Sequence, residues 1–129
     1  MLKGFRLPLL AAAVALAPAT LRADDAAVLA KLAGSWVGEW QYDANMKGKL
    51  TATFTVDGGA VKGETVWFAT AVGDFGDKVQ GAKVKGAGVR VMESTMDFEG
   101  TFSEDGATFK GTWTSPVATG TLILKKEAR

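Results

Sequence analysis

The sequence predicts an all-β fold, an eight-stranded antiparallel up-and-down meander barrel with a short N-terminal helix. Apolar and polar residues alternate along short segments, and glycine-rich turns separate these segments. No segment between them has the length or the periodicity of a crossover helix. Closing eight such strands removes the exposed sheet edges and leaves an interior about wide enough for side chains to fill.

The chain opens with a segment typical of a secretory signal peptide. Two basic residues precede an apolar run from 7 to 17, and small residues follow it. The run is shorter than the roughly 20 apolar residues that cross a bilayer as a helix, so we expect cleavage rather than a membrane anchor. Cleavage after Ala23 is preferred over cleavage after Ala19, because it leaves a fuller polar segment behind the apolar run. The protein is therefore expected to be periplasmic or secreted, with no membrane span once residues 1–23 are removed.

Composition narrows the class of partner. Removing residues 1–23 takes away 3 of the 15 basic residues and none of the 14 acidic ones, so 12 basic residues remain against 14 acidic ones and the net charge is −2. Because no basic stripe remains, nucleic acid is not an expected partner. The chain has no cysteine, so the domain depends on its core and not on disulfides.

Residues 24–34 are expected to form the short helix. Its sequence is DDAAVLAKLAG, in which the aspartates suit a helix N-terminus and Gly34 can end the helix. The apolar residues Val28, Leu29 and Leu32 share one side, which is expected to pack on the barrel. Residues 35–129 then form the barrel domain.

Strand periodicity predicts which side chains point inward. In GSWVGEW, Trp36 and Trp40 share one face and Glu39 lies on the other, because a strand alternates its faces with a period of two. The same alternation continues through LTATFTV, MDFEGTF and ATFKGTW. The predicted inward set is Trp36, Trp40, Tyr42, Leu50, Phe54, Val56, Trp67, Phe98, Phe102, Phe109, Trp113, Leu122 and Leu124. Glycines at 63, 100, 111 and 120 recur on this face, where they are expected to bend a strand, admit a large ring or leave space for a ligand.

A short helix, the motif G-x-W at the start of the first strand (Gly34, Ser35, Trp36) and a basic residue at the end of the last strand resemble the lipocalin-like, or calycin, group of barrels. Within that group the chain resembles a small bacterial exported protein, and LAGSWVGEW also resembles the opening of nitrobindin-type barrels. The resemblance covers roughly residues 26–126. It implies that Trp36 closes one end of the barrel under the helix, with Lys126, or Lys125 if the register slips, across its ring. The chain has no histidine, so the haem chemistry of nitrobindin-type barrels does not carry over, and no cofactor is expected.

Residue types argue against an enzyme. Without histidine or cysteine no Ser-His or Cys-His pair can form, and zinc would have to rely on carboxylates alone. Asp97 and Glu99 are expected to be solvated surface, and GDFGD, with Asp74 and Asp77, a plain loop and not a calcium site. No catalytic or metal-binding residue is therefore predicted. Glu93 has two readings, an inward side chain or a turn position near the barrel mouth.

The inward aromatic residues support two readings of the interior. One is a packed core, because each ring buries a large area and eight short strands enclose little spare volume. The other is a pocket at the open end, in which Trp40, Tyr42, Trp67 and Trp113 would hold a small apolar ligand. On the second reading the protein is an exported, non-enzymatic binding protein of unknown specificity.

A protein-interaction module is the alternative function. The segment 66–76 is unusually apolar for a connection, and if Trp67 points inward, Phe68 points away from the interior. Exposed Phe68 and Phe75 would then mark a protein-binding surface, as in an exported inhibitor or an envelope assembly component.

Overall fold

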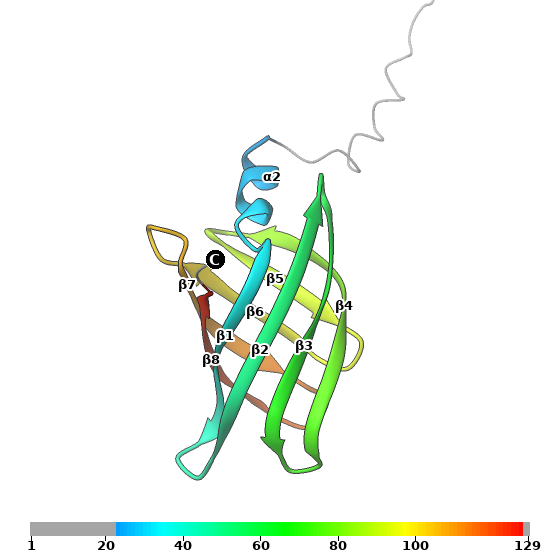
Figure 1. The fold of residues 1–129 in the computed structure, drawn as a ribbon, viewed down its shortest axis with the longest axis vertical. Coiled ribbons are helices and arrows are strands. Elements are labelled where there is room, and N and C mark those ends of the chain that lie inside the picture. Colours follow the sequence, from blue (N-terminus) through cyan, green and yellow to red (C-terminus); the bar gives the residue numbers. More distant parts are fainter. Residues whose placement is uncertain (1–22, 128–129) are drawn as a thin grey trace, which may run out of the picture.

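The structure, a computed structural model, describes residues 23–127 as one closed barrel of eight antiparallel strands with a short helix (Figure 1). Each strand pairs with the next along the chain, and β1 pairs with β8 to close the barrel. The predicted fold class is confirmed, and it is compatible with a lipocalin-like barrel. Apart from Ala23, the predicted signal peptide lies outside the described residues. The elements are α2 (Ala23–Ala30), β1 (Gly34–Asp43), β2 (Met46–Asp57), β3 (Ala60–Thr70), β4 (Gly73–Lys85), β5 (Gly88–Glu93), β6 (Asp97–Phe102), β7 (Thr108–Thr114) and β8 (Thr119–Lys126).

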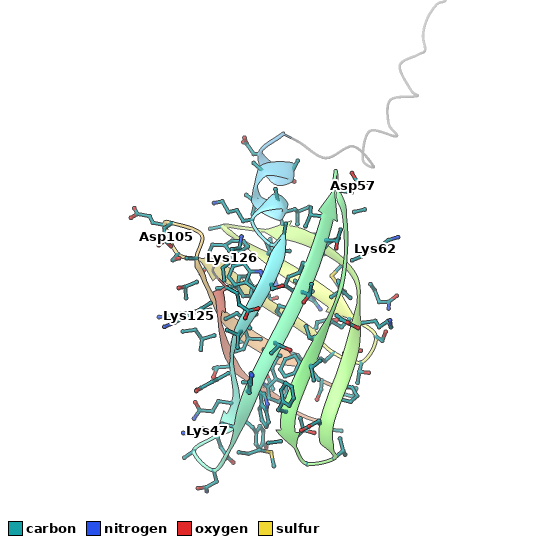
Figure 2. All side chains as sticks on the ribbon, viewed as in Figure 1. Lys47, Asp57, Lys62, Asp105, Lys125 and Lys126 are labelled. Carbon is teal, nitrogen blue, oxygen red and sulfur yellow. The ribbon has the colours of Figure 1, made fainter. Side chains whose placement is uncertain are left out.

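The two ends of the barrel differ. Helix α2 lies over one end, the covered end, beside the hairpin that joins β2 to β3 (Figure 1). The opposite end, the mouth, is formed by the hairpins β1–β2, β3–β4, β5–β6 and β7–β8. In Figure 2, Asp57 and Lys126 mark the covered end, and Lys47 marks the mouth.

Helix α2 is shorter than predicted. It ends at Ala30, because the next three residues donate their N–H groups to carbonyls only three positions back, a tighter turn than the α-helix. Gly34 does not cap it but begins β1 with a φ of 120°, a value that favours glycine. Leu29 and Leu32 are buried under this turn, as their shared side predicts.

The inward set is correct for most of the barrel. Its buried members are Trp36, Trp40, Leu50, Phe54, Trp67, Phe98, Phe109, Trp113, Leu122 and Leu124. Val56 and Phe102 are half-buried and pack against this core near the covered end, whereas Tyr42 is 49% exposed at the mouth. The predicted inward residues that are not fully buried therefore lie at strand ends, where fewer side chains surround them.

Trp36 closes the covered end. Its indole Nε1 donates to the Leu32 carbonyl at 2.8 Å, which ties β1 to the turn that follows α2. The ammonium of Lys126 lies 5.0 Å from the centroid of the Trp36 ring and donates to the Lys31 carbonyl at 3.0 Å. The expected pairing of Lys126 with Trp36 is confirmed, because the two residues are directly opposite in the β1–β8 ladder.

Candidate functional site

A pocket of about 420 Å³ opens at the mouth. This volume lies within the range of roughly 300 to 1,000 Å³ that is typical of small-molecule sites. All four hairpins of the mouth contribute to its wall, which is almost wholly apolar and, among residues 23–127, includes no charged side chain. The lining residues are Trp40, Tyr42, Met46, Trp67, Thr70, Ala71, Val72, Phe75, Thr95, Met96, Trp113, Ser115, Pro116, Val117 and Ala118.

The four ligand-binding residues proposed from the sequence lie together in this pocket. Trp113 is central to them, with its ring centroid 6.3 Å from that of Trp40, 6.1 Å from that of Trp67 and 6.4 Å from that of Tyr42. Below them Phe98 packs edge-on against Trp67 at 6.5 Å, and the interior continues as packed core. The two interpretations of the interior therefore apply to different parts of the barrel. Between the tryptophans and the covered end the interior is packed core, and on the mouth side of the tryptophans it is a pocket.

A glycine and a bulge fix the position of Trp40. Its indole Nε1 donates to the Phe68 carbonyl on β3 at 2.8 Å, so the ring reaches across β2. It can do so because β2 has Gly48 at the crossing, where a Cβ would lie 2.1 Å from the Phe68 oxygen. The β3–β4 register shifts between Trp67 and Thr70, and Ala69 there has a φ of 62°, rare for a residue with a side chain. Sequence patterning did not single out Gly48 or this bulge.

A buried chain of polar groups links Trp67 on β3 to Glu93 on β5 inside the barrel. The Trp67 indole Nε1 donates to Thr65 Oγ1 at 2.8 Å, and the Thr65 hydroxyl donates to Glu93 Oε2 at 2.6 Å. Glu93 is 7% exposed, and its other carboxylate oxygen, Oε1, has no hydrogen-bond partner in the described protein. Burial raises the pKa of Glu93 from 4.5 to about 7, although the Thr65 hydrogen bond opposes that rise. Of the two readings of Glu93, the inward one is therefore correct.

Trp113 differs from the other tryptophans in its polar atom. The indole N–H groups of Trp36, Trp40 and Trp67 all donate a hydrogen bond, whereas the buried Trp113 Nε1 has no partner in the described protein. Gly120 lies against this ring, since a Cβ there would come within 2.6 Å of it. Gly120 thus makes room for Trp113, as the recurring glycines suggested.

The other recurring glycines serve the sheet and not a ligand. A Cβ at Gly63, Gly100 or Gly111 would lie 1.9 to 2.2 Å from a carbonyl oxygen of the neighbouring strand. None of these three, nor Gly120, lines the mouth pocket. The expectation that they leave space for a ligand is wrong, because the space is already taken by backbone and by the Trp113 ring.

The rim of the mouth is apolar. Among the described residues, the large apolar side chains that remain exposed are Tyr42 at 49%, Met46 at 37%, Val72 at 82% and Val117 at 91%, and all four line the pocket. They come from three separate hairpins. Of these four residues, the sequence analysis predicted only Tyr42 as part of the site. Val72 and Val117 could have been predicted, because an apolar residue inside a hairpin turn is unusual.

Phe68 and Phe75, the proposed interaction surface, are not brought together. Phe75 is half-buried and lines the pocket opposite Trp67 in the β3–β4 ladder. Phe68 is also half-buried, and the ammonium of Lys49 lies 5.7 Å from its ring centroid. Residues 66–70 and 73–76 are the facing ends of β3 and β4, and only Ala71 and Val72 form the turn between them, so most of this apolar segment belongs to strands and not to a connection.

The acidic residues have structural partners. Asp74 accepts from the Ala69 N–H at 3.1 Å, and buried Asp77 accepts from the Thr95 N–H at 3.1 Å; both are in strand β4 and not in a loop. Asp97, expected to be solvated, instead pairs with the Arg90 guanidinium at 2.6 Å. Within residues 23–127 no cluster of three or more acidic side chains has the arrangement of a metal site.

Comparison with known proteins adds no assignment: no protein-family model matches the sequence, and no curated protein matches it. Among the described residues there is no helix with the length and apolar character needed to span a membrane.

Proposed function

We propose that this protein is an exported, non-enzymatic binding protein of the lipocalin-like group that holds a small apolar ligand in the mouth pocket. One observation carries the proposal: a pocket of ligand size with apolar walls lies where three tryptophan rings meet. Aromatic faces and edges offer a flat or aliphatic molecule extensive contact.

The chemistry of the wall narrows the ligand. None of the described residues that line the pocket is charged, so a charged group of the ligand would lose its hydration without gaining a partner among them. Hydroxyl groups come from Tyr42, Thr70, Thr95 and Ser115, placed toward the ends of the strands and in the loops of the mouth. We therefore favour an uncharged ligand, or one whose polar end faces the rim.

Titration with a neutral fluorescent probe tests the proposal. The chain from Asp24 onward is titrated with N-phenyl-1-naphthylamine, followed by the probe's emission, and then with a panel of fatty acids and aromatic molecules that compete for it. We expect saturable binding on the order of micromolar. Absence of saturable binding by every compound would contradict the proposal.

Replacing one of two exposed alanines by phenylalanine locates the binding site. Ala71→Phe adds a ring to the pocket wall in the exposed β3–β4 turn, whereas Ala87→Phe adds the same ring in the exposed β4–β5 turn at the covered end. Ala71→Phe is expected to weaken probe binding at least several-fold, and Ala87→Phe to leave it unchanged. Equal effects of the two would place the probe outside the mouth.

The exposed rim favours a second candidate function, docking of a protein partner at the mouth, as for an exported inhibitor or envelope assembly component. Val72 and Val117 stand almost fully in solvent, and such apolar side chains gathered at one end mark interaction surfaces. Replacing both by serine should abolish capture of such a partner while the probe still binds deep in the pocket. If the double serine variant instead lost probe binding and still captured the partner, a ligand-binding function would be favoured.

Export has its own test. We propose cleavage after Ala23, so the intact mass of the secreted protein should correspond to a chain that begins at Asp24. A mass that includes Met1 would show that the segment is retained.

A further inference from the structure

Glu93 is connected to the mouth pocket on two sides. Through Thr65 its carboxylate is hydrogen-bonded to Trp67, whose ring lines the pocket. Its own backbone N–H donates to the Met96 carbonyl at 2.9 Å, and Met96, like Thr95, lines the pocket from the β5–β6 loop. A change at the carboxyl group therefore reaches both an aromatic wall and a loop wall of the pocket.

The surroundings of Glu93 disfavour a negative charge. Buried Asp77 on β4 and Asp97 on β6 both act on it as like charges. The nearest basic group by sequence, Arg90, is paired with Asp97, and none of the ion pairs within residues 23–127 includes Glu93. With Oε1 unpartnered as well, an ionised Glu93 has one hydrogen bond, from Thr65, to replace its lost hydration.

We propose that Glu93 makes the affinity of the mouth pocket for its apolar ligand depend on pH, with tight binding when the carboxyl group is neutral and weaker binding when it is ionised. The inference rests on the proposed function. An ionised carboxylate needs a donor for Oε1, which has none in the described protein, so we expect water to enter or the neighbouring β5–β6 loop to move. Either change wets or reshapes an apolar wall.

The position of the transition follows from burial. Because burial raises the pKa of Glu93 to about 7, the switch falls near neutral pH. By linkage the effect is reciprocal: an apolar ligand that excludes water from the wall raises the pKa of Glu93 further. A rise of one pKa unit on binding corresponds to about a tenfold change in affinity between the two protonation states.

The experiment measures the dissociation constant of N-phenyl-1-naphthylamine at pH 5.5, 7 and 8.5, a range over which this probe stays neutral. For the unmodified protein we expect affinity at pH 8.5 to be about fivefold to tenfold weaker than at pH 5.5. Glu93→Gln cannot ionise and should bind with nearly constant affinity, close to that of the unmodified protein at pH 5.5. Glu104→Gln, the same change at an exposed loop position near the covered end, should keep the unmodified profile.

Each outcome decides between the two proposals. Binding that does not vary with pH in the unmodified protein overturns the role of Glu93 and leaves the proposed function standing. No binding at any pH overturns the proposed function and the inference with it. If Glu93→Gln does not fold, the Glu93 carboxyl carbon is followed by NMR in the unmodified protein, and a pKa unchanged by the probe sinks the inference.

Discussion

At the covered end Trp36 lies under helix α2 with its ring buried, its N–H bonded to Leu32 and Lys126 across its face. At the mouth Trp40 and Trp113 are nearly as buried, yet each also borders the pocket, and the Trp113 N–H has no partner in the described protein. The same residue type closes one end and lines a hollow at the other. The difference lies in the cover, because within residues 23–127 the only helix, α2, lies over the covered end, and the turn that follows it accepts the Trp36 hydrogen bond.

A filled end and an open end therefore coexist in one small barrel. Leu29 and Leu32 of the covering segment are fully buried and belong to the same apolar core as Trp36. The mouth hairpins instead hold their exposed apolar side chains around the hollow. Stability should therefore be concentrated at the covered end, and binding at the mouth.

The largest expected effect is that of Trp36→Ala, which should lower the free energy of unfolding by about 3 to 5 kcal/mol by leaving a cavity beneath α2. Urea unfolding followed by circular dichroism measures it. Outward-facing Glu39→Ala should change stability by less than about 0.5 kcal/mol. Comparable losses for both would mean that the facing of β1 is reversed.

Glu93 near the mouth should show the next largest effect, and it depends on pH. Since the pKa is about 7 in the folded protein and 4.5 is the usual value, the folded state binds more protons between these pH values, and stability falls as pH rises through this window. The loss amounts to about 3 kcal/mol and is complete above pH 7.

Glu93→Gln should accordingly be more stable than the unmodified protein at pH 8.5, by up to about 3 kcal/mol, and little different at pH 4. Urea unfolding at both pH values checks this. An equal gain at both would point to altered packing and not to titration.

Gly48→Ala tests how the mouth holds Trp40. The added Cβ would lie 2.1 Å from the Phe68 oxygen and 2.8 Å from Trp40 Nε1, so the hydrogen bond between them must break. We expect a loss of about 1 to 3 kcal/mol and a shift in tryptophan emission. Gly76→Ala on β4 is the matched control, because the nearest atom to its Cβ is 3.9 Å away. A harmless Gly48→Ala would show that Trp40 is not fixed across β2.

The smallest expected effect is that of Lys126→Met, which removes the ammonium from the Trp36 ring and from the Lys31 carbonyl. The loss should be about 0.5 to 1 kcal/mol, measured by thermal unfolding. Lys125→Met, at the adjacent exposed position, should cost less. If the two substitutions lower stability equally, Lys126 stabilises the protein no more than an ordinary solvent-exposed lysine does.

Local alternation made the strands and their facing predictable. Because side chains alternate with a period of two, the inward placement of Trp36, Trp40, Trp67 and Trp113 follows from neighbouring residues alone. The four proposed ligand residues could be chosen this way, as each is an aromatic residue on the inward face. Tyr42 shows what alternation cannot predict: its position in the strand is an inward one, but its side chain is 49% exposed because the strand ends there at the mouth.

The tertiary structure decided what lies across the chain from each residue. Gly48 matters because Trp40 crosses it to reach β3, and Glu93 matters because Thr65, 28 positions away, donates to it. Phe68 and Phe75 occupy neighbouring positions of the β3–β4 ladder but present different faces, because Phe75 lines the pocket opposite Trp67 whereas Phe68 packs against Lys49. Periodicity is a local property of the chain, and it determines which face of the sheet a side chain occupies. The register of the paired strands and the cover over each end depend on residues far apart in the sequence. They determine how deeply a side chain is buried, which residues it contacts and where the pocket forms.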